Sequence, residues 1–311
     1  MSYVLYSKPY KTSQSLIHDL KSKRLSFHNE QAAENLLNQI SYYHFKIYLH
    51  PLLDTSNNKL YKNNTFFEDG VQLYRFDEEL RSLLFKVIAR IEVKLRSRLD
   101  HTMSSLNGDP FWYLDNQYFY CPRAIDQTRD RISLDFNREN ELYAKNFREK
   151  YYNERHHKYK NLPPFWISSE LISLGQIYKI YDSINFKIST SYPNVLNKLA
   201  AEFGAPNYKV LVNWIQCIRN IRNRCAHHSR VWNAKLTAPS KITPLLTFKP
   251  TKDNRPYGSI AALQIMLKTL GIHDLTLKDK LNELFTQYPF AKSNMSEAGF
   301  PLNWDTDTIW L

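Results

Sequence analysis

One apolar stripe of unusual length sets the fold class of this chain. It runs through residues 68–103, where large hydrophobic side chains recur every three or four positions, at Leu73, Phe76, Leu80, Leu83, Val87, Ile91 and Leu95. This spacing places them on one face of a single long helix. Only seven glycines occur in 311 residues, fewer than the turns of an all-β or Rossmann-like fold require. The chain is therefore predicted to be all-α.

Shorter helical patterns flank the long one. Thr12 or Ser13 would cap a helix over 12–24, and Asn29 would cap one over 30–39. Further helices are expected after Pro163-Pro164 (continuous through Gly175, which would pack closely on a neighbour), from Asn207 to about Ser229, near 260–270 and over 277–285. The domain prediction is an N-terminal helical segment (1–66), a helical core (67–240) and a C-terminal extension (241–311).

Charge and cysteine usage narrow the class of partner and compartment. The net charge is +12, the pI is near 9.4 and aromatics make up 14%, which favours nucleic acid as a partner. A basic but inert surface arising from a Lys-rich coding bias is the alternative. Three cysteines without ligand spacing predict no disulfide framework or metal site. No apolar run could span a membrane, so we expect a cytoplasmic protein without membrane contacts. We also expect no cofactor.

The chemistry is concentrated between Arg222 and Asn233, in the string RNRCAHHSRVWN. This string lies in a stretch from Phe203 to Lys252 that has no Asp or Glu. The stretch does have nine basic residues: Lys209, Arg219, Arg222, Arg224, Arg230, Lys235, Lys241, Lys249 and Lys252. A histidine among uncompensated positive charges predicts an anionic partner, and a phosphodiester is the natural candidate.

A helical wheel at roughly 100° per residue orients these groups. His227 falls opposite the apolar stripe, beside Asn223 and Arg230, and is expected to face outward, whereas His228 lies nearer the edge of the stripe and suits a structural role. Arg222 is roughly 140° from His227. Either the helix bends near Arg222 or a second copy of the chain completes the site.

Arg222, Asn223 and His227 together suit RNA cleavage without a metal. A histidine can take the proton of the 2′-OH or supply one to the leaving 5′-oxygen, and an arginine can hold the charge of the pentacoordinate transition state. Asn223 would orient the imidazole or the phosphate. The segment offers no carboxylate cluster for two-metal chemistry. The expected products carry 2′,3′-cyclic phosphate and 5′-OH ends.

The longer pattern resembles the Abi-like family of abortive-infection proteins (AbiD/AbiF type), a branch of the HEPN superfamily. The string at 222–233 is similar to its signature, and further matching segments are 41–49, 73–81, 90–96, 164–175 and 299–304. The resemblance implies a HEPN-like helical bundle with N- and C-terminal extensions, dimeric or internally paired, in which Arg222 and His227 form the R-x4-6-H motif and Asn223 is their polar neighbour. It also implies a phage-defence toxin restrained by an RNA or protein antitoxin.

The remaining site residues have weaker support. Glu92 is an accessory polar candidate, with an ion pair to Arg96 as its alternative, and His228 is a second accessory residue. Predicted RNA contacts are Arg219, Arg224, Arg230 and Lys235, although Arg230 could instead anchor the following turn. Ser229 stands where adenylylation-controlled HEPN toxins have tyrosine, which puts that form of control in doubt.

Several alternatives stay open. The chain could be a non-catalytic RNA-binding module or a helical scaffold for a protein partner. No second R-x4-6-H occurs in a comparable setting, which favours a homodimer. The basic and aromatic segment 145–160 is read either as an RNA-contacting arm or as a solvated helical face.

Overall fold

A computed structural model of the chain describes residues 3–7, 9–188 and 194–311. The predicted all-α class is confirmed, because the described residues contain helices and isolated β-bridges but no strand. The helices are α1 (Ser13–Ser22), α2 (Glu30–Gln39), α3 (Tyr42–Phe45), α4 (Phe67–Ser104), α5 (Pro122–Arg138), α6 (Leu142–Lys150), α7 (Phe165–Leu171), α8 (Leu174–Ser183), α9 (Val195–Glu202), α10 (Tyr208–Ala226), α11 (Pro256–Thr269), α12 (Leu277–Gln287) and α13 (Pro289–Ser293). None of the helices in these described ranges is long and apolar enough to cross a membrane.

The chain forms two compact units. The first comprises residues 1–79 and 282–294, and the second comprises 80–281 and 295–311. The predicted motif at 222–233 lies wholly in the second unit. The predicted division into domains 1–66, 67–240 and 241–311 stays a prediction.

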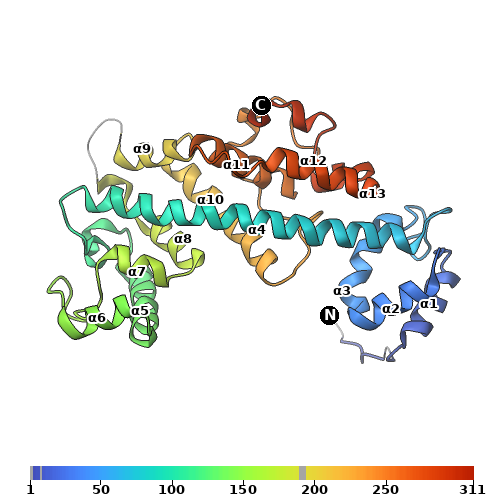
Figure 1. Cartoon of the computed structure of the whole chain (residues 1–311), viewed down its shortest axis with the longest axis horizontal. Helices are drawn as coiled ribbons and strands as arrows, with labels where there is room; N and C mark the ends of the chain where they lie inside the picture. The colour runs from blue at the N-terminus through green and yellow to red at the C-terminus, as the bar shows by residue number, and fades with distance from the viewer. Residues whose placement is uncertain (1–2, 8, 189–193) are drawn as a thin grey trace. The chain divides into compact units, whose positions relative to one another are not determined.

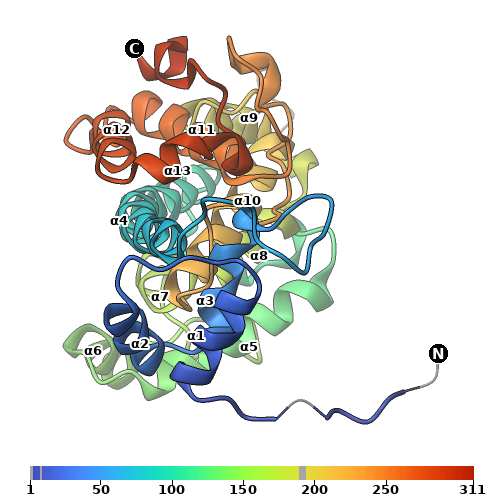
Figure 2. The ribbon, with the colours of Figure 1, turned by 90° about the vertical axis from the view of Figure 1, so that its right-hand side faces the viewer.

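The first unit begins with α1 packed against α2, as both views of the ribbon show (Figures 1 and 2). Both helices start at the predicted caps, since Thr12 accepts a hydrogen bond from the Ser15 amide and Asn29 accepts one from the Ala32 amide. The aromatic segment that follows forms α3 and a 3₁₀ helix (Lys46–Leu52). Tyr48 there is fully buried and donates to Asp77 at 2.7 Å.

The second unit is built around the part of α4 that begins at Leu80, with α10 packed on α8, α9 and α11 (Figure 1). The predicted apolar stripe is buried along this part of α4, except that Leu84 and not Leu83 lies in the core. Tyr181 of α8 ties the bundle to α4 by donating to the Leu95 carbonyl at 2.9 Å. Arg98 of α4 binds Glu202 at the end of α9, with an Nη2–Oε1 distance of 2.7 Å.

The helix expected to run through Gly175 is in fact two helices. α7 ends at Leu171, and α8 begins after Ser173, which forms a reciprocal capping box with Gln176. A serine followed three residues later by glutamine satisfies the first amides of a new helix, and this local bonding interrupts the apolar periodicity. Gly175 therefore lies in a first turn. A Cβ there would meet Ser173 Oγ at 3.5 Å, an ordinary contact, so the close packing expected at this glycine is wrong.

The motif helix α10 ends at Ala226, three residues before the predicted end at Ser229. The Ser229 amide donates to the Arg224 carbonyl at 2.8 Å and the His228 amide donates to Cys225 at 3.2 Å. His228 has φ +53°, the left-handed conformation that this pattern needs. These bonds make up a Schellman motif, with histidine in the position that glycine usually takes. The outward wheel position assigned to Arg230 is wrong, because Arg230 lies beyond the helix.

Candidate functional site

α10 presents the three predicted catalytic residues in two different directions. Its buried stripe is the predicted one, from Leu211 to Cys225. Asn223 and His227 are exposed, and the His227 amide donates to the Asn223 carbonyl at 3.0 Å, so both stand at the free end of the helix. Arg222 is half-buried instead, with its guanidinium carbon 5.7 Å from the centroid of the Phe85 ring on α4.

The three side chains are not joined directly. Across the described ranges, no hydrogen bond or ion pair links the Arg222 side chain to that of Asn223 or His227. This agrees with the roughly 140° that separates Arg222 from His227 on a helix. The tertiary structure thus brings Arg222 to α4 and leaves His227 facing solvent.

Arg222 forms one wall of a cavity of 310 Å³ between α4, α7 and α10. Its lining residues are Phe85, Ala89, Glu92, Val93, Arg96, Glu170 and Arg222. Glu92 forms an ion pair with Arg96, and the side chains of both are only 13–14% exposed. Arg96 also donates to the Ser169 carbonyl. The ion pair with Arg96, which was the alternative to an accessory role for Glu92, is therefore present. Both residues line the Arg222 cavity.

The cavity also places negative charges near the basic motif, which the sequence did not predict. The acid-free stretch from Phe203 to Lys252 is not acid-free in space, because Glu92 and Glu170 line the same cavity as Arg222. Sequence reasoning missed Glu170, Arg96 and Phe85 as neighbours of the motif. The spacing along the chain has no signal for them, since they come from helices far away in sequence.

The four predicted RNA-binding residues differ in exposure and in their contacts within the protein. Arg219 lies against α8, with its guanidinium 4.4 Å from the centroid of the Tyr178 ring. Arg224 donates to the Arg230 carbonyl at 3.0 Å, and so it closes the turn after α10. Arg230 is half-buried in that turn, and Lys235 is exposed. Of this set, Lys235 extends most freely into solvent, and the RNA contacts themselves stay a prediction.

The end of the motif anchors the site. Val231 and Trp232 are fully buried, and the Asn233 carbonyl accepts from Arg255 at 2.7 Å. The turn containing His228 is thereby held between the end of α10 and a buried tryptophan. This arrangement keeps His227 at a defined position although its side chain is exposed.

The segment 145–160 is not one helical face, so that interpretation is wrong beyond Lys150, where α6 ends. Asn153 organises the following loop, because its amide nitrogen donates to the carbonyls of Tyr159 and Leu162, each at 2.8 Å. Lys158 pairs with Asp130 at 2.7 Å, so its charge is used within the protein. Tyr151 and Tyr152 remain 58% and 70% exposed, and the RNA-contacting role stays a prediction.

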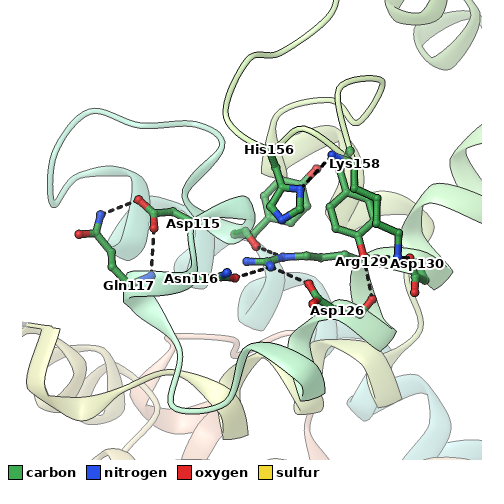
Figure 3. Close-up of polar contacts among 10 residues, drawn as sticks. Asp115, Asn116, Gln117, Asp126, Arg129, Asp130, His156 and Lys158 are labelled. Atoms are coloured by element: carbon green, nitrogen blue, oxygen red, sulfur yellow. Dashed lines mark hydrogen bonds and ion pairs between the residues drawn. The ribbon is translucent and has the colours of Figure 1, made fainter.

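Beneath this loop lies a buried arginine, shown in Figure 3. Arg129 is fully buried and donates to the Tyr113 carbonyl at 2.9 Å, to Asn116 at 2.7 Å and to Asp126 at 2.9 Å. His156 lies over it (Figure 3) and accepts the Lys158 amide proton through Nδ1 at 3.2 Å. Burial, and then the charge of Arg129, lower the pKa of His156. The loop thus holds a neutral imidazole next to a buried cation.

Other chemistry-bearing groups are sparse. Within the described residues, no group of three or more His, Cys, Asp or Glu side chains is placed to hold a metal ion. Burial raises the pKa of the Cys217 thiol to about 12, so this thiol stays protonated at neutral pH. The polar groups at the end of α10 therefore remain the best candidate site.

Fold and site together define a class: an all-α protein with a basic helix that ends in an exposed histidine and carries a half-buried arginine on another face. The family described as Abi-like protein matches residues 35–233, which is most of the chain and ends at the buried anchor after the motif. The chain belongs to this family, and the predicted resemblance to the Abi-like family is confirmed. Membership associates it with abortive infection, a form of phage defence. No curated protein and no solved structure matches the chain.

Proposed function

We propose that this protein is an endoribonuclease of a phage-defence system and that Arg222, Asn223 and His227 form its HEPN-type active site. The observation that carries the proposal is the placement of the motif. His227 is exposed at the end of α10, one turn from Asn223, while Arg222 of the same helix lines the cavity between α4, α7 and α10. A catalytic histidine must be reachable by RNA, and the His227 side chain is exposed, while its backbone amide is bonded to the Asn223 carbonyl.

In this proposal the 2′-oxygen attacks the adjacent phosphorus and the 5′-oxygen leaves. His227 takes the proton of the 2′-OH, and a second proton is delivered to the 5′-oxygen. The Arg222 guanidinium stabilises the phosphorane through charge-assisted hydrogen bonds, and Asn223 orients the phosphate or the imidazole. The P–O5′ bond breaks as the P–O2′ bond forms, which leaves a 2′,3′-cyclic phosphate and a 5′-OH.

A homodimer would supply what one chain lacks. The reaction needs one group to remove a proton and another to deliver one, and each chain has a single His227 in this setting. Next to Arg222, α4 exposes the apolar side chains Phe85 and Val93, which are 41% and 63% exposed. They lie eight residues apart, on one helix face. A second copy covering this face would bring a second motif to the same RNA, so we include the homodimer in the proposal.

The activity is tested with purified protein, total cellular RNA and EDTA. Wild-type protein is compared with Arg222→Ala and His227→Ala, and His228→Gly serves as a control because it changes the neighbouring histidine. We expect wild type and His228→Gly to cut RNA and leave cyclic-phosphate ends, while the two motif variants do not. DNA lacks the 2′-OH and should be spared.

The same experiment tests the RNA-binding alternative. If no variant and no wild-type preparation cleaves RNA, but all bind it, the chain is a non-catalytic RNA-binding module. RNA that co-purifies must then be stripped and the assay repeated, because a bound antitoxin RNA would block the site. Cleavage that survives in His227→Ala would contradict the assignment of the active site.

A further inference from the structure

A second cavity lies at the opposite end of α10 from the motif. Its volume is 480 Å³, within the roughly 300–1,000 Å³ typical of small-molecule sites. Two buried tyrosines, Tyr181 and Tyr208, line it with near-parallel rings whose centroids are 6.2 Å apart. Both are fixed, because Tyr208 donates to the Tyr181 carbonyl at 2.7 Å and Tyr181 donates to Leu95 at 2.9 Å. This part of the cavity is thus rigid and aromatic.

Two further aromatic residues lining the cavity are open to solvent. Tyr120 is 60% exposed and Phe186 is 37% exposed. They are joined by a hydrogen bond of 3.0 Å from the Phe186 amide to the Tyr120 hydroxyl. Exposed aromatic rings at a preformed cavity offer flat faces on which a planar ligand can stack.

The polar groups of the cavity have unused bonding capacity. The side-chain oxygens of two asparagines already accept hydrogen bonds from the backbone. Asn197 accepts from the Tyr208 amide at 2.9 Å, and Asn207 accepts from the Val210 amide at 3.0 Å. Over residues 3–7, 9–188 and 194–311, their amide nitrogens make no hydrogen bond, and neither does the Asp182 carboxylate or the Lys209 ammonium. All four line the cavity. It therefore offers a hydrogen-bond acceptor, two amide donors and a cation around aromatic surfaces.

We propose that this cavity binds a nucleotide. The base would stack on the exposed aromatic rings, Asp182 would accept an N–H of the base, and the asparagine amides would donate to its ring nitrogen or carbonyl groups. Lys209 would hold the phosphate. A purely apolar ligand would make no hydrogen bond to these four polar groups, whereas a nucleotide can pair with all of them.

The ligand has two sources with the same chemistry, a free mononucleotide or one residue of an RNA strand. Lys209 and His227 are 18 positions apart, which is about 27 Å along a helix. The bound nucleotide is therefore not the one at the proposed cleavage site. The inference rests on the cavity alone and does not depend on nuclease activity.

Binding is measured by isothermal titration calorimetry on the full chain with His227→Ala, so that RNA stays intact. The ligands are the four ribonucleoside 5′-monophosphates and single-stranded RNA tetranucleotides of each base. We expect at least one ligand to bind once per chain. Lys209→Ala should weaken binding about tenfold, Asp182→Asn should change the preferred base, and Tyr120→Leu should weaken all bases.

Lys198→Ala is the matched control, because Lys198 is an exposed lysine on α9 that does not line the cavity. It removes the same charge and should leave binding unchanged. Binding of mononucleotides identifies a free effector, and binding of tetranucleotides only identifies a strand site. The proposal is overturned if neither ligand binds at millimolar concentration, or if Lys209→Ala and Asp182→Asn bind as tightly as Lys198→Ala. Thermal unfolding confirms that each variant is folded.

Discussion

At the scale of single residues, His227 and His228 are neighbours with different tasks. His227 caps α10 with φ −99°, whereas His228 adopts the left-handed conformation with φ +53°. A β-branched side chain is strained in that conformation by about 1–2 kcal/mol, and glycine is not. The two histidines can therefore be separated by mutation although they are adjacent.

We expect His228→Gly to keep or raise the free energy of unfolding and His228→Val to lower it by about 1–2 kcal/mol. Under the proposed function, both variants keep RNA cleavage while folded, because the backbone of His228 and not its imidazole matters. Urea denaturation and the EDTA assay measure the two effects. Loss of cleavage in a stable His228→Gly would show that this imidazole takes part in the reaction.

A second residue-scale prediction concerns pH. The pKa of His156 is lowered by burial and by Arg129, with smaller contributions from His157 and Lys158 that outweigh Asp126. The unfolded chain therefore binds a proton more readily than the folded one. The stability contributed by neutral His156 is complete above the unfolded pKa of about 6.5 and is lost as the pH falls through the folded value.

Thermal unfolding between pH 7.5 and 5.5 checks this dependence. Wild type should lose more thermal stability over this range than His156→Gln, which cannot gain the proton. His18→Gln, an exposed histidine on α1, should behave as wild type does. Equal pH profiles for wild type and His156→Gln would contradict the prediction.

At the scale of elements, the break between α7 and α8 is set by Ser173. Its hydroxyl accepts from the Gln176 amide and its own amide donates back to the Gln176 side chain at 2.8 Å. Replacing such a cap by alanine costs about 1 kcal/mol. The break matters for the site because α7, just before it, carries Glu170 to the Arg222 cavity.

We therefore expect Ser173→Ala to lower the free energy of unfolding by about 1 kcal/mol. Ser183→Ala at the other end of α8 is the control, since the Ser183 hydroxyl donates to the Lys179 carbonyl of the same helix and does not cap it. Chemical denaturation of both variants measures the difference. If the two variants were equally stable, the capping box would not set this boundary.

At the scale of the whole molecule, the proposed homodimer makes the sharpest prediction. Light scattering of the wild-type protein should give a molar mass of about twice the chain mass of 36.9 kDa. Val93→Asp places a charge on the exposed apolar face of α4 and should yield monomers that no longer cleave RNA. Because Val93 is 63% exposed, the monomer should stay folded.

Lys94→Asp is the control for this variant, as it adds the same acidic side chain one position further along α4. It should leave the dimer intact. A wild-type monomer with full cleavage activity would contradict the two-copy site and would leave the single-chain motif as the active unit.

Much of the fold could be predicted from sequence because helices encode their own bonding locally. Thr12 and Asn29 cap α1 and α2 as predicted, and the stripe from Leu211 to Cys225 is the buried face of α10. Periodicity reports which face of a helix is apolar. It does not show where one helix ends and the next begins. For this reason the sequence predicted one helix in place of α7 and α8, and an end of α10 at Ser229 in place of Ala226.

The sequence by itself determined the helical class, the family and the set of groups at the end of α10. Only the tertiary structure decided which side chains lie next to the basic residues of α10: Glu92 and Glu170 line the Arg222 cavity, and the Tyr178 ring lies against Arg219. It also placed His156 over the buried Arg129 in another part of the second unit. Local patterns fix backbone hydrogen bonds within a few residues of one another. Side-chain partners from distant segments depend on how helices pack, which no spacing along one chain records.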